Sequence, residues 1–403
     1  MDLYEHAMTS NFVRDPNDEG FGLYVHWPFC LSKCPYCDFN SHVAEKVDQP
    51  LWHRGLLREQ EHFAARTRGR TLTSIFFGGG TPSLMDPATV AAVIAAAKSH
   101  WSTHTDLEIT LEANPGTVDA ARFTALRDAG INRLSMGVQA LNEADLRFLG
   151  RKHGVAEART AWRTAARIFP RVSFDLIYAR PGQTVAAWSA ELDEALREVR
   201  DLGITHLSLY QLTMEEGTAM HAAHKRGDFV LPDEDTAAQL YDLTQELCAA
   251  YGLPAYEISN HAADGAACRH NLTYWRGGDY IGIGPGAHGR LTENGITRAL
   301  SQFRAPAHWL NRIESAGHAT QVETPLSSQD RAEELVMVGL RTTEGLVKDR
   351  FARLAGVPLE QVTRATGKAQ LVAGGFLTED SQRLTTTPQG RLALNAVLRQ
   401  LLI

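Results

Sequence analysis

The chain has 403 residues, of which 44% are hydrophobic, and a formal net charge of -7. A chain of this length can bury a substantial core, so a single small module is excluded and one large or two unequal domains are expected. The negative charge and the scattered lysines and arginines provide no basic surface for nucleic acid, so we expect no nucleic-acid partner.

The cellular compartment is predicted from the first residues and from the cysteines. Residues 1–19 form a polar, acidic tail without the apolar core of a signal peptide, and no run of 18 apolar residues occurs anywhere. Three of the five cysteines are crowded into eight residues, which is not the pattern of a disulfide framework. These features predict a cytoplasmic protein with no membrane-spanning segment.

Short apolar strands alternate with amphipathic helices along residues 20–255. The expected strands are residues 23–27, 74–77, 107–111, 133–138, 172–177 and 206–211. The expected helices are residues 51–65, 87–100, 119–129, 143–149, 155–169, 184–200 and 235–251. Serial βα units produce parallel strands joined by right-handed crossovers, so the sequence predicts an α/β fold with a partial (β/α)6, TIM-like barrel.

The remaining residues have a different texture. Residues 256–325 are rich in glycine and aromatic residues and are predicted to be a loop-rich connecting segment. Residues 326–403 combine helical patterns with one turn-rich stretch, which predicts a small, mainly helical, winged-helix-like domain. Wings of this kind often bind nucleic acid, but no basic recognition helix is present. A structural or partner-docking role is therefore expected.

Three cysteines, Cys30, Cys34 and Cys37, follow the first strand with C-x3-C-x2-C spacing. Three thiolates can bind three irons of a cubane iron–sulfur cluster and leave the fourth iron open for a small molecule. A tetrahedral zinc site is the alternative, but it normally takes a second pair of ligands a dozen or more residues later. Because Cys248 and Cys268 are distant and are not spaced as a pair, the pattern favours the cluster.

Polar or glycine-rich residues occur where several predicted strands end. The cysteine loop follows the first strand, and the sequence GGGTP at residues 78–82 follows the second. Glu112 ends the third strand, Gln139 ends the fourth, and Asp175 lies in the fifth. The carboxyl ends of the strands meet at one mouth of such a barrel, and glycine backbone can approach a ligand closely. The sequence therefore predicts one ligand site at this mouth.

The segment YVHWPFCLSKCPYC at residues 24–37 resembles the cluster-binding loop of radical S-adenosylmethionine proteins. With GGGTP downstream, it is similar to the branch that contains oxygen-independent coproporphyrinogen III oxidase and heme chaperones. The resemblance covers most of the chain. It implies a [4Fe-4S] cluster bound by the three cysteines and S-adenosylmethionine bound to the open iron. One electron from the cluster would then cleave the cofactor's carbon–sulfur bond to give a 5'-deoxyadenosyl radical.

The same resemblance implies which residues contact S-adenosylmethionine. Each also has a simpler interpretation, such as a core tyrosine, a tight turn, an exposed carboxylate, a buried amide or a surface arginine. The common position at the barrel mouth favours the ligand roles. The implied contacts are Tyr24, Tyr36, Gly80, Thr81, Glu112, Gln139, Arg151 and Asp175.

Two features distinguish the members of this branch. Phe39 lies two residues after Cys37, where the oxidase is expected to carry another cysteine. The segment HNLTYW at residues 270–275 is similar to a signature of the heme chaperones, and it offers an imidazole for iron and aromatic rings for a porphyrin face. The implied heme residues are His270, Asn271, Tyr274 and Trp275; the simpler interpretation of the histidine is a structural hydrogen-bonding residue.

These features predict a heme chaperone that binds a [4Fe-4S] cluster, S-adenosylmethionine and heme. Its expected partners are respiratory-chain hemoproteins, which implies transient association with a membrane, and the sequence leaves both a monomer and a homodimer open. One alternative is an oxygen-independent coproporphyrinogen III oxidase, which removes carboxyl groups from propionates by radical chemistry. Another is a zinc-stabilised binding protein without a redox role. The resemblance favours the chaperone over an enzyme.

Overall fold

The computed structural model describes residues 19–403, so the predicted tail lies outside the described residues except for Glu19. The central feature is an eleven-stranded sheet in the order β13-β12-β11-β10-β1-β4-β5-β6-β7-β8-β9. Six strands are parallel in this order: β1 (Phe21–Trp27), β4 (Thr71–Gly79), β5 (Ser102–Ala113), β6 (Arg133–Gln139), β7 (Arg171–Tyr178) and β8 (His206–Gln211). The six predicted strands and the α/β fold class are confirmed.

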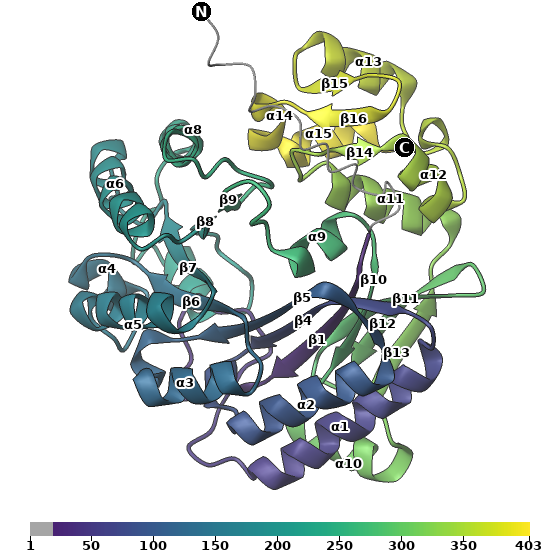
Figure 1. The fold of residues 1–403 in the computed structure, drawn as a ribbon. Coiled ribbons are helices and arrows are strands. Elements are labelled where there is room, and N and C mark those ends of the chain that lie inside the picture. The colour runs from purple at the N-terminus through teal and green to yellow at the C-terminus, as the bar shows by residue number, and fades with distance from the viewer. Residues whose placement is uncertain (1–18) are drawn as a thin grey trace, which may run out of the picture.

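Helices pack on the outer face of this sheet (Figure 1). They are α1 (Gln49–Arg66), α2 (Pro87–His100), α3 (Ala120–Asp128), α4 (Glu143–Phe148), α5 (Val155–Ile168), α6 (Val185–Asp201) and α8 (Glu234–Ala250). The short helix α7 (Ala219–Lys225) lies beside the cysteine loop, where the Met220 amide donates to the Pro35 carbonyl oxygen. Side-chain oxygens accept hydrogen bonds from the first-turn amides of several of these helices, including Asp48 before α1 and Thr184 before α6. No helix within residues 19–403 is long and apolar enough to cross a membrane.

The strands position the site because successive residues face opposite sides of the sheet. Leu23, Val25 and Trp27 of β1 are completely buried in the main hydrophobic core. The alternate residues, Tyr24 and His26, line a cavity on the inner side. The same alternation in neighbouring strands separates an apolar outer layer under the helices from a polar interior.

Residues 256–325 differ from the predicted loop-rich segment. They form β9 (Asn260–Ala262), α9 (Arg269–Trp275), β10 (Asp279–Ile283), β11 (His288–Glu293), β12 (Ile296–Gln302), α10 (Pro306–Ala316) and β13 (Thr320–Pro325). Strand β10 pairs in parallel with β1, and β11, β12 and β13 extend the sheet, each antiparallel to the strand before it. Glycines in this segment indicate loops by sequence pattern alone, but in the structure they allow strands to pack closely. A Cβ on Gly282 would lie 2.1 Å from the His288 carbonyl oxygen.

The C-terminal residues have a hydrophobic core of their own. They form α11 (Ser328–Gly339), β14 (Leu346–Val347), α12 (Lys348–Ala355), α13 (Ala365–Ala373), β15 (Leu377–Glu379), β16 (Arg383–Thr386), α14 (Pro388–Leu392) and α15 (Leu394–Leu401). A three-stranded sheet in the order β14-β16-β15 accompanies the helices, as a mainly helical, winged region requires. Figure 1 shows this region beside α9 and above the sheet.

Buried polar contacts connect the C-terminal region to the barrel. The guanidinium of Arg331 on α11 donates to the carbonyl oxygen of Gly277, just after α9. Arg276 forms an ion pair of 2.8 Å with Glu344, and Arg341 forms one of 3.3 Å with the buried Glu257. A charged group that is shielded from water is stable only while it is paired. These contacts therefore favour one position of the C-terminal region on the barrel.

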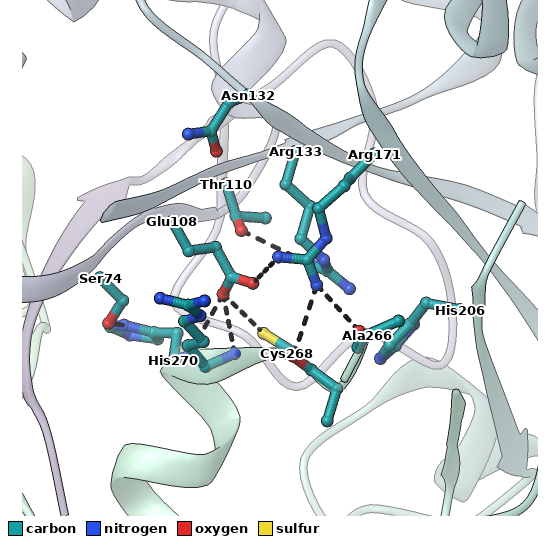
Figure 2. A network of polar contacts seen from close by, with 12 residues as sticks. Ser74, Glu108, Thr110, Asn132, Arg133, Arg171, His206, Ala266, Cys268 and His270 are labelled. Atoms are coloured by element: carbon teal, nitrogen blue, oxygen red, sulfur yellow. Dashed lines mark hydrogen bonds and ion pairs between the residues drawn. The ribbon is translucent and has the colours of Figure 1, made fainter. Parts of the chain in front are cut away.

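A buried carboxylate holds α9 against the amino ends of the strands (Figure 2). Glu108 of β5 forms an ion pair of 2.7 Å with Arg171, the first residue of β7. Its other oxygen accepts from the backbone amides of Arg269 (2.9 Å) and His270 (3.2 Å), and the Cys268 thiol donates to it at 3.4 Å. A negative charge at the amino end of a helix is favourable. Glu108 therefore positions α9.

We predict that Glu108→Gln destabilises the protein. The substitution removes the charge that faces Arg171 and can turn an amide N–H group toward backbone N–H donors. The free energy of unfolding should fall by about 3 kcal/mol, as measured by chemical denaturation followed by circular dichroism. Glu314→Gln on the exposed face of α10 is the matched control and should change stability by no more than about 0.5 kcal/mol. Equal denaturation midpoints for the two variants would contradict this role of Glu108.

Candidate functional site

A cavity of about 1000 Å³ lies at the carboxyl ends of the parallel strands. The cysteine loop, the ends of β4 to β8 and the C-terminal helices α14 and α15 all contribute to its walls. All three cysteines and every predicted S-adenosylmethionine contact except Tyr24 line it: Cys30, Cys34, Tyr36, Cys37, Gly80, Thr81, Glu112, Gln139, Arg151 and Asp175. The structure thus brings together residues that are up to 145 positions apart in the chain, from Cys30 to Asp175.

Each cysteine thiol has a polar neighbour. The Thr81 hydroxyl donates to Cys30 Sγ at 3.4 Å, and the Arg151 guanidinium donates to Cys34 Sγ at 3.4 Å. The Cys37 sulfur lies 3.9 Å from the Ser41 hydroxyl. Burial raises the pKa of the Cys30 and Cys37 thiols, so thiolates at these positions require a compensating positive charge such as iron.

The arrangement fits a cluster better than a single metal ion. Within residues 19–403, no three histidine, cysteine, aspartate or glutamate side chains converge on a point that would hold one ion. A tetrahedral zinc site needs four ligands around one centre, whereas each cysteine of a cubane binds a different iron. Three cysteines in the wall of one cavity are the number that a cubane with one open iron requires.

The glycine-rich loop packs directly on the cysteine loop. A Cβ on Gly80 would lie 2.8 Å from the Phe29 carbonyl oxygen and 3.0 Å from Cys30 Sγ, distances that an alanine could not occupy without a shift of backbone. The Gly80 amide donates to the Trp27 carbonyl oxygen at 2.7 Å. Glycine at this position therefore sets the distance between the end of β4 and the cysteines.

Arg151 connects the cysteine loop to two strand ends. Its guanidinium donates to the carbonyl oxygen of Gly137 at 2.7 Å and to the Asn114 side-chain oxygen. It also lies 3.5 Å from the Tyr36 hydroxyl, which places Tyr36 beside the cysteines. The sequence analysis did not identify Asn114. Its position, two residues after Glu112 and directly after β5, is the signal that could have identified it.

Gln139 is held in an unfavourable backbone conformation. Its φ of 79° lies in the left-handed region that residues other than glycine rarely adopt. Its side-chain Oε1 is buried without a hydrogen-bond partner within residues 19–403. Strained residues persist where the surrounding structure holds them, and they cluster at ligand sites. The unpaired oxygen in the cavity wall is thus available to a polar ligand.

Two buried carboxyl groups face the same cavity. Glu112 accepts a hydrogen bond of 3.2 Å from the Gly79 amide, and burial together with nearby Asp175 raises its pKa to about 8. Burial also raises the pKa of Asp175 to about 6, although Ser135 donates to it at 3.4 Å. Both groups favour a ligand that carries positive charge, because such a ligand stabilises their ionised forms.

Tyr24 lies outside the main cavity. It lines a second cavity of about 510 Å³, which adjoins the first and shares Asp38, Phe39, Gly79 and Glu112 with it. The Tyr24 hydroxyl lies 3.0 Å from His26 Nδ1, and burial followed by the charge of Glu112 raises the tyrosine pKa well above its usual value. Its proposed contact with S-adenosylmethionine stays a prediction.

The structure places the HNLTYW segment in α9, with His270 only 1% exposed. The His270 Nδ1 lies 2.8 Å from the Ser74 hydroxyl, and Nε2 lies 2.6 Å from the Tyr274 hydroxyl (Figure 2 shows Ser74 and His270). Both ring nitrogens are therefore engaged, as expected of a structural histidine. Iron ligation by His270 stays a prediction, and it would require one of these hydrogen bonds to break.

The other residues of this segment face different parts of the molecule. Asn271 is 3.5 Å from the Tyr256 hydroxyl, and Tyr274 lines the smaller cavity. The Arg341 guanidinium lies over the Trp275 ring at 4.7 Å from its centre, and Arg341 in turn lines the main cavity. The segment thus supports the walls of both cavities.

Sequence reasoning also missed the cavity residues from the C-terminal region. They are Arg341, Arg391, Leu392, Ala393, Leu394, Asn395, Ala396 and Arg399. No motif marks them, because their position depends on how the C-terminal region docks over the barrel mouth.

Comparison with known proteins decides the family. The model for the radical SAM superfamily matches residues 24–195. A protein named radical S-adenosyl methionine domain-containing protein 1, mitochondrial, from Bos taurus is 38% identical and aligns over 96% of this chain and 88% of its own length. The Escherichia coli protein named heme chaperone HemW is 36% identical, over 93% of this chain and 96% of its own. The chain belongs to the HemW family of radical SAM proteins.

Further comparisons extend this result to the C-terminal region and the fold. The model for the HemN C-terminal domain matches residues 326–393. The structure of coproporphyrinogen III oxidase (HemN) from Escherichia coli superposes with a TM-score of 0.77 at 21% identity, over 94% of this chain and 89% of that one. The shared fold includes the C-terminal region. A [4Fe-4S] cluster and S-adenosylmethionine are the cofactors of the radical SAM superfamily, and the cavity residues fit both.

We predict that the three clustered cysteines, and not the other two, hold iron. After anaerobic reconstitution, the wild-type chain should contain about four iron and four sulfide ions. Cys34→Ser should lose most of both, because only two thiolates remain. The control is Cys248→Ala, at a completely buried position in α8 away from the cavity, which should keep the full content. Equal iron and sulfide content in Cys34→Ser and wild type would contradict the assignment.

Proposed function

We propose that this chain is a heme chaperone that carries a [4Fe-4S] cluster and S-adenosylmethionine in its main cavity and delivers heme to other proteins. The observation that carries the proposal is the match, over almost the whole chain, to proteins named heme chaperone HemW. The two matching family models cover the cysteine loop, within residues 24–195, and most of the C-terminal region, residues 326–393. The proposed acceptors are respiratory-chain hemoproteins, reached from the cytoplasm by transient association with the membrane.

Residues of the main cavity are assigned to the cofactors by their chemistry. The three cysteines would hold three irons of the cluster and leave the fourth iron open to S-adenosylmethionine. The unpaired Gln139 oxygen accepts from a polar group of this cofactor, and ionised Glu112 and Asp175 offset its positive charge. When bound, a reduced cluster and S-adenosylmethionine would supply radical chemistry at this site.

Oxygen-independent coproporphyrinogen III oxidase is the second candidate. The fold shared with HemN favours it, as does a cavity that has room beyond the cofactors. The residue after the cluster argues against it: Phe39, where the oxidase is expected to have a cysteine, is 55% exposed beside the cavity. A phenyl ring there offers no thiol for chemistry but provides an apolar contact for a porphyrin.

We predict that the reconstituted chain binds ferric heme at one equivalent and does not oxidise coproporphyrinogen III. Heme titration followed by the Soret band measures the first property. Anaerobic incubation with coproporphyrinogen III, S-adenosylmethionine and a low-potential reductant, followed by chromatography of the products, measures the second. Formation of protoporphyrinogen would overturn the chaperone proposal in favour of the oxidase, and absence of heme binding would contradict it directly.

We also predict that affinity for S-adenosylmethionine rises with pH because of Glu112. Below its pKa of about 8, this carboxyl group is protonated in the ligand-free protein, and the positively charged ligand favours its ionised form. The dissociation constant should fall about tenfold between pH 6.5 and pH 8.5, as measured by calorimetry. Glu112→Gln should flatten this slope, whereas Glu216→Gln at an exposed position should keep it. An unchanged slope in Glu112→Gln would exclude this residue as the coupled group.

A further inference from the structure

The smaller cavity lies beside the cofactor cavity, between the inner face of β1, strand β10, the start of β11 and the cysteine loop. Its volume of about 510 Å³ is in the range of sites for organic ligands. Asp38, Phe39, Gly79 and Glu112 line both cavities. A ligand here would therefore be a direct neighbour of the cofactors.

The walls of this cavity suit a flat aromatic ligand. Tyr24, Tyr274 and Tyr280 line it, and the rings of Tyr274 and Tyr280 pack edge to face with centres 4.4 Å apart. The exposed ring of Phe39 lies at its boundary with the main cavity. Aromatic side chains provide large apolar surfaces with defined orientation, which is how a macrocycle is held.

Two histidines line the cavity, and they differ in their hydrogen bonds. His26 is engaged at both nitrogens, by the Tyr24 hydroxyl (3.0 Å) and by the Asn40 carbonyl oxygen (2.9 Å). His288, the first residue of β11, is exposed, and its ring nitrogens make no hydrogen bond within residues 19–403. The main cavity has no histidine among its described lining residues. His288 is thus the imidazole whose ring nitrogens are available to a metal.

A neutral imidazole can offer iron the lone pair of one ring nitrogen. The cavity wall also supplies a cation for a carboxylate group. Arg304, which also lines the cavity, forms no ion pair within residues 19–403 and can bind a carboxylate.

We propose that the smaller cavity is the heme site, with His288 as the axial ligand of the iron, tyrosine rings against the macrocycle and Arg304 paired with a propionate. This assignment rests on the proposed chaperone function, and nothing in the comparisons assigns it.

The proposal also gives the HNLTYW segment a different task from iron ligation. His270 is a positioning residue, because its bond to Tyr274 orients a wall of the heme site and its bond to Ser74 anchors the ring in the barrel.

Heme titration of the full-length, reconstituted chain tests the ligand. His288→Ala should weaken binding of ferric heme at least tenfold and shift the Soret band, and imidazole added to His288→Gly should restore the wild-type spectrum. His308→Ala, at an exposed histidine on α10, is the matched control and should behave as wild type. Wild-type affinity and spectrum in His288→Ala would overturn the assignment. If the wild-type chain itself bound no heme, the proposed function would fail instead.

The role of His270 is tested separately, because its loss can disturb the fold. His270→Gln and Tyr274→Phe should keep the wild-type Soret position, since the iron ligand remains, while the affinity for heme falls by about threefold through the altered wall. Thermal unfolding of each variant shows that it is folded. Loss of the wild-type Soret band in folded His270→Gln, with the band retained in His288→Ala, would assign iron ligation to the motif and overturn our proposal.

Discussion

Two backbone hydrogen bonds join the residues after β4 to the end of β1 and the start of the cysteine loop, and the site depends on them. The Gly80 amide donates to the Trp27 carbonyl oxygen at 2.7 Å, and the Thr81 amide donates to the Phe29 carbonyl oxygen at 2.9 Å. These bonds require close approach of two backbones, which only glycine allows at position 80. They set the cysteine loop over the mouth of the barrel and bring the Thr81 hydroxyl to Cys30. Binding of the cluster, of S-adenosylmethionine and of heme all depend on this position of the cysteine loop.

Burial governs the charges around this mouth. It raises the pKa of the carboxyl groups of Glu112 and Asp175 and of the thiols of Cys30 and Cys37, so a positively charged ligand would favour the ionised form of each. The interior therefore favours iron and a cationic cofactor over water. At the opposite, amino ends of the strands, the charge of Glu108 is offset inside the protein by Arg171 and by the backbone amides of α9. The carboxyl ends of the strands thus have charges that a ligand can offset, whereas the charges at the amino ends are already paired within the protein.

The sequence predicted those parts of the fold and site that depend on local pattern. The six parallel strands have clear apolar runs, and the ends of such strands meet at one mouth whatever the details of packing, so the cysteines and Glu112 could be placed together. The alternation that makes β10 a strand was hidden, because glycines such as Gly282 serve close strand packing and were interpreted as loop signals. Local sequence pattern therefore predicted most residues of the main cavity but did not predict strands β10 to β13.

Other features depend on tertiary contacts that no local pattern records. Arg391 and Arg399 reach the main cavity only because the C-terminal region docks on the barrel. The backbone strain at Gln139 follows from the packing of its neighbours. The His270 ring pairs with Ser74, nearly 200 positions earlier in the chain, and with Tyr274. The sequence motif suggests an iron ligand, but it does not show that both ring nitrogens already have hydrogen-bond partners.

Heme transfer to an acceptor tests the central claim most directly. The heme-loaded, cluster-containing chain would be mixed with the heme-free form of a respiratory hemoprotein in membrane vesicles, and the acceptor's own heme spectrum followed after the vesicles are separated. Our account predicts that the vesicles gain the spectrum of the mature hemoprotein while the chain loses an equal amount of heme. Retention of all the heme by the chain, with no spectrum in the vesicles, would contradict it.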